Sequence, residues 1–186
     1  MYKSKPNTSK LLYNLSIFLF SLVLFTSCGG NHKTEVDAIE KLEVRLEENL
    51  KNLEIDDALF SARIEYIERV LRYFSNDYNT QMSLELGNNL DKLKTLKKIY
   101  AKRLNEHASN LKEQGELGTQ LATLKTDISN GAMSKEEFKS YYTTEKIDTE
   151  VLLNSSVAVK KALYEVEPEY SRIIETLSPL LPGDLR

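Results

Sequence analysis

One thiol and two imidazoles are the most reactive side chains in this 186-residue chain, and they belong to Cys28, His32 and His107. A thiol can carry an acyl or alkyl group, pair in a disulfide or bind a metal, and an imidazole can bind a metal or move a proton. Zinc, di-iron and c-type haem sites require several Cys, His or Glu ligands at fixed spacings, and the sequence has none of these patterns. We therefore expect no metal or cofactor.

Other catalytic patterns are also missing from the sequence. We find no nucleophile motif, no phosphate-binding glycine loop and no spaced pair of carboxylates, and we expect no enzymatic activity. His107 falls on an apolar helical stripe, where a hydrogen-bonded core or boundary histidine is the favoured interpretation. Asp57 interrupts another apolar stripe, and antiparallel pairing of the two stripes places it beside Tyr100. A buried hydrogen bond between Asp57 and Tyr100 that fixes the helix register is our hypothesis for this position.

Cys28 follows a segment with the features of an export signal. Three lysines at positions 3, 5 and 10 precede an apolar stretch over residues 11–25, and the small residues Thr26 and Ser27 come next. This order of charged, apolar and small residues is typical of a secretory signal peptide. The apolar stretch is shorter than the roughly 20 residues that a membrane-spanning helix needs, so a permanent transmembrane span is the less favoured interpretation.

The run Phe25-Thr26-Ser27-Cys28 resembles the lipobox of bacterial lipoproteins, in which small residues precede a cysteine that becomes the lipidated first residue. The resemblance implies a signal peptide over residues 1–27 and lipid attachment, with palmitate among the acyl chains, at Cys28. The neighbouring Gly29, Gly30 and Asn31 offer no apolar periodicity that would bury a free thiol, which also favours lipid attachment. The lipid would hold the chain on a membrane, because each buried methylene contributes about 0.8 kcal/mol.

The same resemblance implies a location in the bacterial cell envelope. No Asp follows Cys28, which is similar to lipoproteins that are released to the outer membrane. A periplasmic and a surface-facing orientation are both compatible with the sequence. We therefore expect a lipid-anchored protein of the outer membrane.

Composition limits the partners and the fold. Removal of residues 1–27 would take away three lysines and no acidic residue, which changes the formal net charge from −3 to −6. An acidic chain without a dominant basic face disfavours a nucleic-acid partner and electrostatic adsorption to anionic lipids. The chain has no Trp and few Gly and Pro residues, and Glu, Lys and Leu are frequent, which is typical of long helices.

The first of three helical patterns begins soon after the cysteine. Positions from Leu46 to Tyr78 that alternate spacings of four and three residues are apolar or aromatic in nine cases out of ten, and Asp57 is the exception. This periodicity predicts one helix over about residues 34–74. The polar cluster over residues 75–80 predicts the turn that follows it.

A second apolar stripe covers residues 86–128. Gly115 and Gly118 lie inside it, and because glycine costs about 1 kcal/mol relative to alanine in a helix, we expect a bend or break there. Asn130-Gly131 is typical of a left-handed helix cap and predicts the end of this helix.

The third pattern begins at a capping box, Ser134-Lys135-Glu136-Glu137. Its apolar stripe opens at Phe138 and continues to Leu177, and Pro168 predicts a kink because proline removes one helical hydrogen bond.

These patterns predict an all-α fold, an elongated antiparallel bundle of three long helices with coiled-coil-like packing, or of four helices if the second breaks at Gly115–Gly118. The domain organisation that we expect is a signal peptide over residues 1–27, a lipidated tether over 28–33, a helical bundle over 34–178 and a C-terminal tail over 179–186.

Charge supports the antiparallel order. Residues 91–103 carry a net charge of +5, and antiparallel pairing places them near acidic residues of both neighbouring helices, namely Asp56, Asp57, Glu65, Glu165, Glu167 and Glu169. We favour this intramolecular role over a docking patch for an acidic partner, because most such runs are solvated or internally paired.

The expected function is that of a membrane-anchored helical module for interaction or scaffolding, with a protein as its partner. The alternative is a bundle that senses a small molecule or signal through a pocket between helices near residues 107–118. A sensor of that kind needs an enclosed apolar cavity of about 300 Å³ or more, whereas the core of a scaffold should be filled.

Overall fold

The computed structural model describes residues 32–186, and Cys28, the predicted signal peptide and most of the predicted tether lie outside the described residues. The regular secondary structure of the described residues is all helical, in the order α2 (Lys33–Leu53), α3 (Asp57–Asn76), α4 (Leu84–Ser129), α5 (Lys135–Glu165), α6 (Glu167–Leu177), and the short 3₁₀ turns η1 (Ser178–Leu180) and η2 (Gly183–Leu185). No helix in residues 32–186 combines the length and apolar character that crossing a membrane requires.

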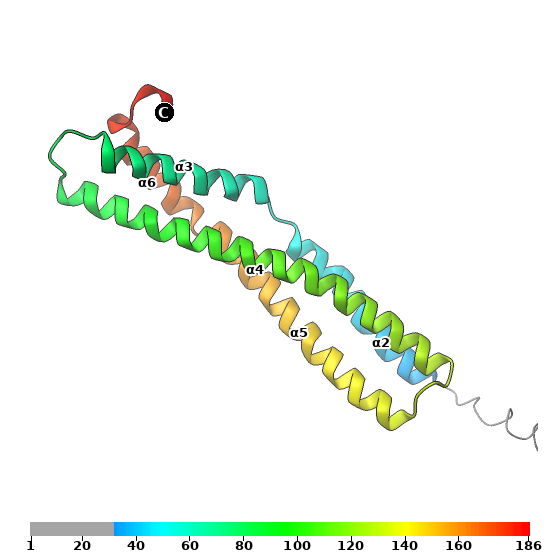
Figure 1. The fold of residues 1–186 in the computed structure, drawn as a ribbon. Coiled ribbons are helices and arrows are strands. Elements are labelled where there is room, and N and C mark those ends of the chain that lie inside the picture. The colour runs from blue at the N-terminus through cyan, green and yellow to red at the C-terminus, as the bar shows by residue number, and fades with distance from the viewer. Residues whose placement is uncertain (1–31) are drawn as a thin grey trace, which may run out of the picture.

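The helices form an elongated antiparallel bundle, as the sequence predicts (Figure 1). The 46 residues of α4 run along the whole bundle, a length of about 69 Å at about 1.5 Å per residue. α2 followed by α3 makes the second rod, and α5 followed by α6 makes the third. We call the end where α2 begins and α4 turns into α5 the proximal end, and the end that holds the α3–α4 connection and η1 the distal end.

The first predicted helix is interrupted, so the expectation of one continuous helix over residues 34–74 is wrong. α2 ends at Leu53, and Glu54 adopts an extended conformation. Asp56 then accepts a hydrogen bond from the Leu59 backbone N–H at 2.8 Å and caps the start of α3. The one local signal for this break is the N-cap residue Asp56, since no Gly or Pro lies at the break. The apolar periodicity continues across residues 54–56 and therefore predicted a continuous helix.

The break also shifts the pairing of α2 with α4. The antiparallel register that pairs Asp57 with Tyr100 also places Asn49, eight residues earlier, near residue 108, whereas Asn49 donates to the Gln114 side chain at 3.1 Å. Extended residues advance about 3.3 Å each instead of about 1.5 Å, so the non-helical residues 54–56 displace α2 by roughly three to four helical residues along α4. This displacement accounts for most of the difference.

α4 is a single helix from Leu84 to Ser129, so the predicted bend or break at Gly115 and Gly118 is wrong. Both glycines lie on the exposed face of α4, while Leu117 and Leu121 on the other face are buried. Packing of the buried face therefore outweighs the low helix propensity of two exposed glycines.

We expect Gly115→Ala and Gly118→Ala each to raise the free energy of unfolding by up to about 1 kcal/mol, because alanine has the higher helix propensity. A Cβ atom at either position would meet no atom within 4 Å. Gly131→Ala is the matched control, since Gly131 has φ 65° and should lose stability with a side chain. Urea unfolding followed by circular dichroism measures all three; a loss of stability in both α4 variants would contradict the account.

The predicted ends of the other helices are confirmed. Asn130 and Gly131 end α4, with Gly131 in the left-handed conformation. Ser134 and Glu137 form the capping box of α5. α5 ends at Glu165 and α6 begins at Glu167, with Pro168 in its first turn, so the proline starts a new helix segment where a kink was predicted.

The last residues of the chain return to the bundle. Leu181 is 1% exposed and packs in the distal core, and Leu185 packs against the same core. The Tyr66 hydroxyl donates to the Leu185 carbonyl oxygen at 2.7 Å and ties η2 to α3. Residues 179–186 therefore cover one side of the distal end.

Two apolar cores hold the bundle together. The distal core joins α3, the first part of α4, the end of α5 and α6, and is centred on Phe60, Tyr100 and Ile173. The proximal core joins α2, the last part of α4 and the first part of α5, and includes Ile39 and Leu152. Each core is made of side chains from all three rods, so each half of the bundle is packed by its own set of residues.

Candidate functional site

The residues singled out in the sequence lie apart from one another. Cys28 lies outside the described residues, and lipid attachment there stays a prediction. His107 is 4% exposed, with its Nε2 atom 3.7 Å from Asp57 Oδ1. His32 lies at the proximal end, just before α2. Within residues 32–186, no group of three or more His, Cys, Asp or Glu side chains has the geometry to hold a metal ion.

The hypothesis of a buried hydrogen bond between Asp57 and Tyr100 is wrong. The Asp57 side chain is 58% exposed. The Tyr100 hydroxyl donates to Glu167 Oε1 at 2.6 Å instead. Asp57 follows the N-cap residue of α3, and this position at the break turns its side chain towards solvent and His107.

A buried polar layer separates the two apolar cores. Asn49 is fully buried and donates to Gln114 Oε1 at 3.1 Å and to Ser156 Oγ at 3.0 Å. Ser155 donates to Asn110 Oδ1 at 3.0 Å in the same region. The sequence stripe placed Leu50 in the core, but Leu50 is 52% exposed and its neighbour Asn49 takes the buried position. The layer fixes the register of the three rods, since its groups have few alternative partners.

The region predicted for a sensor pocket has a hollow of about 260 Å³, lined by Ser109, Lys112, Glu113, Glu116, Leu117, Gln120 and Asp148. Its lining is mostly polar and charged, and it opens to solvent between α4 and α5. A hollow of this kind differs from the enclosed apolar cavity that binding of a small apolar ligand requires.

The basic run of α4 is largely paired within the molecule. Lys92 contacts Glu169 at 3.0 Å and Lys97 contacts Glu68 at 3.2 Å, which joins α4 to both neighbouring rods. Lys94 pairs with Asp91 on α4 itself. Of the six predicted acidic neighbours, Glu169 is the one in a direct ion pair with this run. The intramolecular role that the sequence favoured therefore describes these lysines better than a docking patch does.

A groove at the distal end is the feature with the strongest potential for recognition. It has a volume of about 910 Å³ and lies between α3, α6 and the C-terminal turns, with a lining that includes Arg63, Tyr66, Arg69, Tyr170, Ile174 and Arg186. Tyrosine and arginine are among the residues most enriched at protein interfaces and at their energetic hot spots.

The floor of the groove rests on a polar cluster at the α5–α6 junction. Arg63 Nη2 lies 3.2 Å from Glu167 Oε2, and the Arg63 guanidinium lies 4.3 Å from the centre of the Tyr170 ring. Glu167 also accepts the Tyr100 hydrogen bond. Burial, and then the bond to Glu167, raises the pKa of Tyr100, so its hydroxyl stays protonated and keeps donating. These contacts fix the position of Arg63 and Tyr170.

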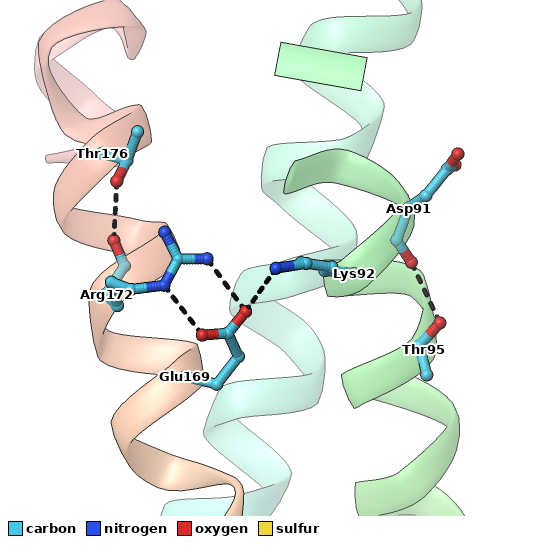
Figure 2. Close-up of polar contacts among 6 residues, drawn as sticks. All are labelled: Asp91, Lys92, Thr95, Glu169, Arg172 and Thr176. Carbon is cyan, nitrogen blue, oxygen red and sulfur yellow. Dashed lines mark hydrogen bonds and ion pairs between the residues drawn. The ribbon is translucent and has the colours of Figure 1, made fainter. Parts of the chain in front are cut away.

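A surface ion-pair network fixes the orientation of α6. Figure 2 shows Glu169 between Arg172, on its own helix, and Lys92 of α4. Arg172 contacts both carboxylate oxygens of Glu169, at 2.8 and 2.9 Å, and Lys92 contacts Oε1 at 3.0 Å. The hydrogen bonds from Arg172 and then Lys92 lower the pKa of Glu169 to about 2. The network therefore joins α6, one wall of the groove, to α4.

The network predicts a pH dependence. A carboxylate whose pKa falls on folding stabilises the fold above its unfolded pKa of about 4.5, and this contribution is lost as pH falls towards about 2. We therefore expect Glu169→Gln to be less stable than the parent chain at pH 7, with a difference that shrinks between about pH 4.5 and pH 2. Urea unfolding of both chains across this range measures it. A difference that is constant with pH would contradict the network, and Glu175→Gln, on an exposed part of α6, is the control.

The groove was missed in the sequence because its residues come from three separate segments. In the sequence, Tyr66 and Tyr170 lie on or beside apolar helical stripes, as core tyrosines do, and Arg63 and Arg69 belong to an ordinary mixed-charge helix face. The missing information was the return of residues 179–186 onto α3. The apolar Leu181 and Leu185, among prolines and a glycine, are the one local signal of that return.

Comparison of the chain with protein-family models, with curated proteins and with solved structures finds no match. The functional interpretation therefore depends on the geometry of the groove and on the sequence around Cys28.

Proposed function

We propose that the chain is a lipoprotein of the bacterial cell envelope, held on the outer membrane through Cys28, whose helical bundle docks or scaffolds a protein partner. The lipobox-like run at Cys28 supports the anchor. In this proposal the protein acts by binding, without an enzymatic reaction, a cofactor or a nucleic-acid partner.

The position of the groove is the observation that carries the proposal. α2 begins at the proximal end, so a lipid on Cys28 joins the bundle there through a short tether. The Arg and Tyr groove lies in the distal half of a bundle whose two ends are separated by the roughly 69 Å length of α4. A tethered rod of this shape would hold its recognition surface well away from the membrane that carries it.

The packing favours this function over the sensing alternative. Both cores are built from buried side chains of all three rods, and the hollow beside residues 109–120 is open and polar. Such packing suits a rigid scaffold, because a bundle with a packed core keeps its shape when a partner binds.

Lysine-reactive crosslinking in intact cells, followed by mass spectrometry, tests the proposal. We expect crosslinks from exposed lysines of the bundle, such as Lys98 and Lys139, to a protein other than the chain itself. The parallel experiment on cells that produce Cys28→Ser controls for contacts made only through the lipid anchor. Absence of crosslinks to any other protein, with the chain present in the envelope, would count against docking and scaffolding.

A further inference from the structure

The distal groove contains two guanidiniums, those of Arg69 and Arg186, that form no ion pair with an acidic side chain of the described residues. Within residues 32–186, no Asp or Glu side chain lies within 4.0 Å of the Arg69 or Arg186 guanidinium. Arg63 is neutralised by Glu167, and Glu175 is the one acidic residue in the groove lining. The cations of the groove therefore differ from the lysines of the basic run of α4, which are largely paired. They also contrast with the net charge of the chain as a whole, which is −3.

The two guanidiniums are held in different ways. Arg186 donates from Nε to the Leu181 carbonyl oxygen at 2.8 Å and from Nη2 to the Pro179 carbonyl oxygen at 3.4 Å, and these backbone contacts hold it at one side of the groove. Arg69 lies 5.8 Å from the centre of the Tyr66 ring and is exposed. A guanidinium beside an aromatic ring keeps its charge while losing little freedom on binding, and it presents a fork of N–H donors that matches a carboxylate.

The dimensions of the groove suit a chain segment better than a single ion. Its volume of about 910 Å³ is near the upper end of the range for small-molecule pockets, and it is open along one side. Tyr66 and Ile174, which are only partly buried, provide apolar surface between the cations, whereas Tyr170 lies beneath the Arg63 guanidinium. Such alternation of apolar walls and guanidiniums is complementary to a peptide in which acidic residues flank an apolar one.

We propose that this groove binds an acidic peptide segment of the partner protein, with carboxylates at Arg69 and Arg186 and an apolar side chain between Tyr66 and Ile174. This inference rests on the proposed docking function and names the chemistry of its partner. A peptide is favoured over anionic lipid because the groove is concave and lies at the end of the rod remote from the predicted anchor.

Selection from a library of random peptides tests the inference. The full chain, purified in detergent, is the target, and the sequences of the retained peptides are compared with the unselected library. We expect enrichment of Asp and Glu around an apolar residue, and binding of the strongest peptide should weaken as salt concentration rises. Arg69→Glu should weaken that binding about tenfold or more, since it reverses the charge at a proposed anchor.

Arg72→Glu is the matched control. Arg72 is an exposed arginine on the same helix, and it borders a different groove, of about 560 Å³, between α3 and α4. It should leave peptide binding unchanged within a factor of about two. Arg69→Gln removes the charge without reversing it and should have an intermediate effect, and circular dichroism checks that every variant folds.

Several outcomes would overturn the inference. Peptides selected without acidic enrichment, or equal weakening by Arg69→Glu and Arg72→Glu, would place recognition elsewhere. Binding of the full chain to phosphatidylglycerol vesicles that depends on Arg69, without acidic peptide binding, would assign the groove to lipid. If crosslinking in cells finds a partner while the peptide test fails, the docking function stands and only the acidic partner is wrong. If acidic peptides bind but no partner is crosslinked, the docking function fails.

Discussion

Cys28→Ser is expected to abolish incorporation of labelled palmitate and to leave a precursor that migrates more slowly than the mature chain. The physical reason is that a serine hydroxyl at position 28 lacks the nucleophilic thiolate to which a lipid could be attached. Without that attachment, a processing enzyme specific for lipidated cysteine has no substrate, so the signal peptide stays on the chain. Metabolic labelling with palmitate, followed by electrophoresis, measures both effects.

Ser27→Ala is the matched control for the anchor. It keeps a small residue directly before Cys28, and labelling and mobility should resemble those of the parent chain. Palmitate labelling that survives Cys28→Ser would contradict the lipoprotein proposal, because Cys28 is the only cysteine in the sequence.

Phe60→Ala is expected to lower the free energy of unfolding by about 3–5 kcal/mol, the usual range for removal of a fully buried phenylalanine. Phe60 is 0% exposed and lies at the centre of the distal core. Its ring stacks on Tyr100 with the ring centres 5.7 Å apart and meets the edge of Tyr164 at 5.2 Å, so the substitution also removes two aromatic contacts. Urea unfolding measures the loss.

Leu84→Ala is the control for Phe60→Ala, since Leu84 is 83% exposed and should change stability by less than about 0.5 kcal/mol. A loss below about 1 kcal/mol in Phe60→Ala would contradict the packing of the distal core.

The milder variant Phe60→Leu tests whether the polar layer divides the bundle. Because Asn49, Ser156 and their neighbours separate two apolar cores, we expect amide hydrogen-exchange protection to fall more in α3 and α6 than in α2. An equal fall in α2 and α3 would indicate that the bundle unfolds as one unit.

The all-α antiparallel bundle could be predicted from the sequence because its information is local and repeated. Ser134 and Glu137 cap a helix through bonds between neighbours in sequence, and Gly131 and Pro168 act through their own backbone geometry. Leu46, Leu53 and Phe60, which lie seven residues apart, are all buried in the structure. The apolar periodicity therefore also predicted the main buried face of the first rod.

The details that the sequence did not predict depend on contacts between distant segments. Asn49 is buried in place of Leu50 because Gln114 and Ser156 supply its hydrogen-bond partners, and periodicity counts only apolar residues. Gly115 and Gly118 stay helical because the opposite face of α4 packs on two other rods. The groove forms because residues 179–186 fold back onto α3. Hydrophobic periodicity does not predict a contact of this kind.

The central claim is that the anchored rod presents its distal end to a protein partner. Site-specific photocrosslinking in intact cells tests this claim most directly. A photoreactive amino acid replaces Ser171, an exposed residue of the groove, or Ser129, an exposed residue at the proximal end of α4. We predict an adduct with another protein from position 171 and none from position 129. Adducts from position 129 alone, or from neither position while the chain is correctly localised, would contradict the account.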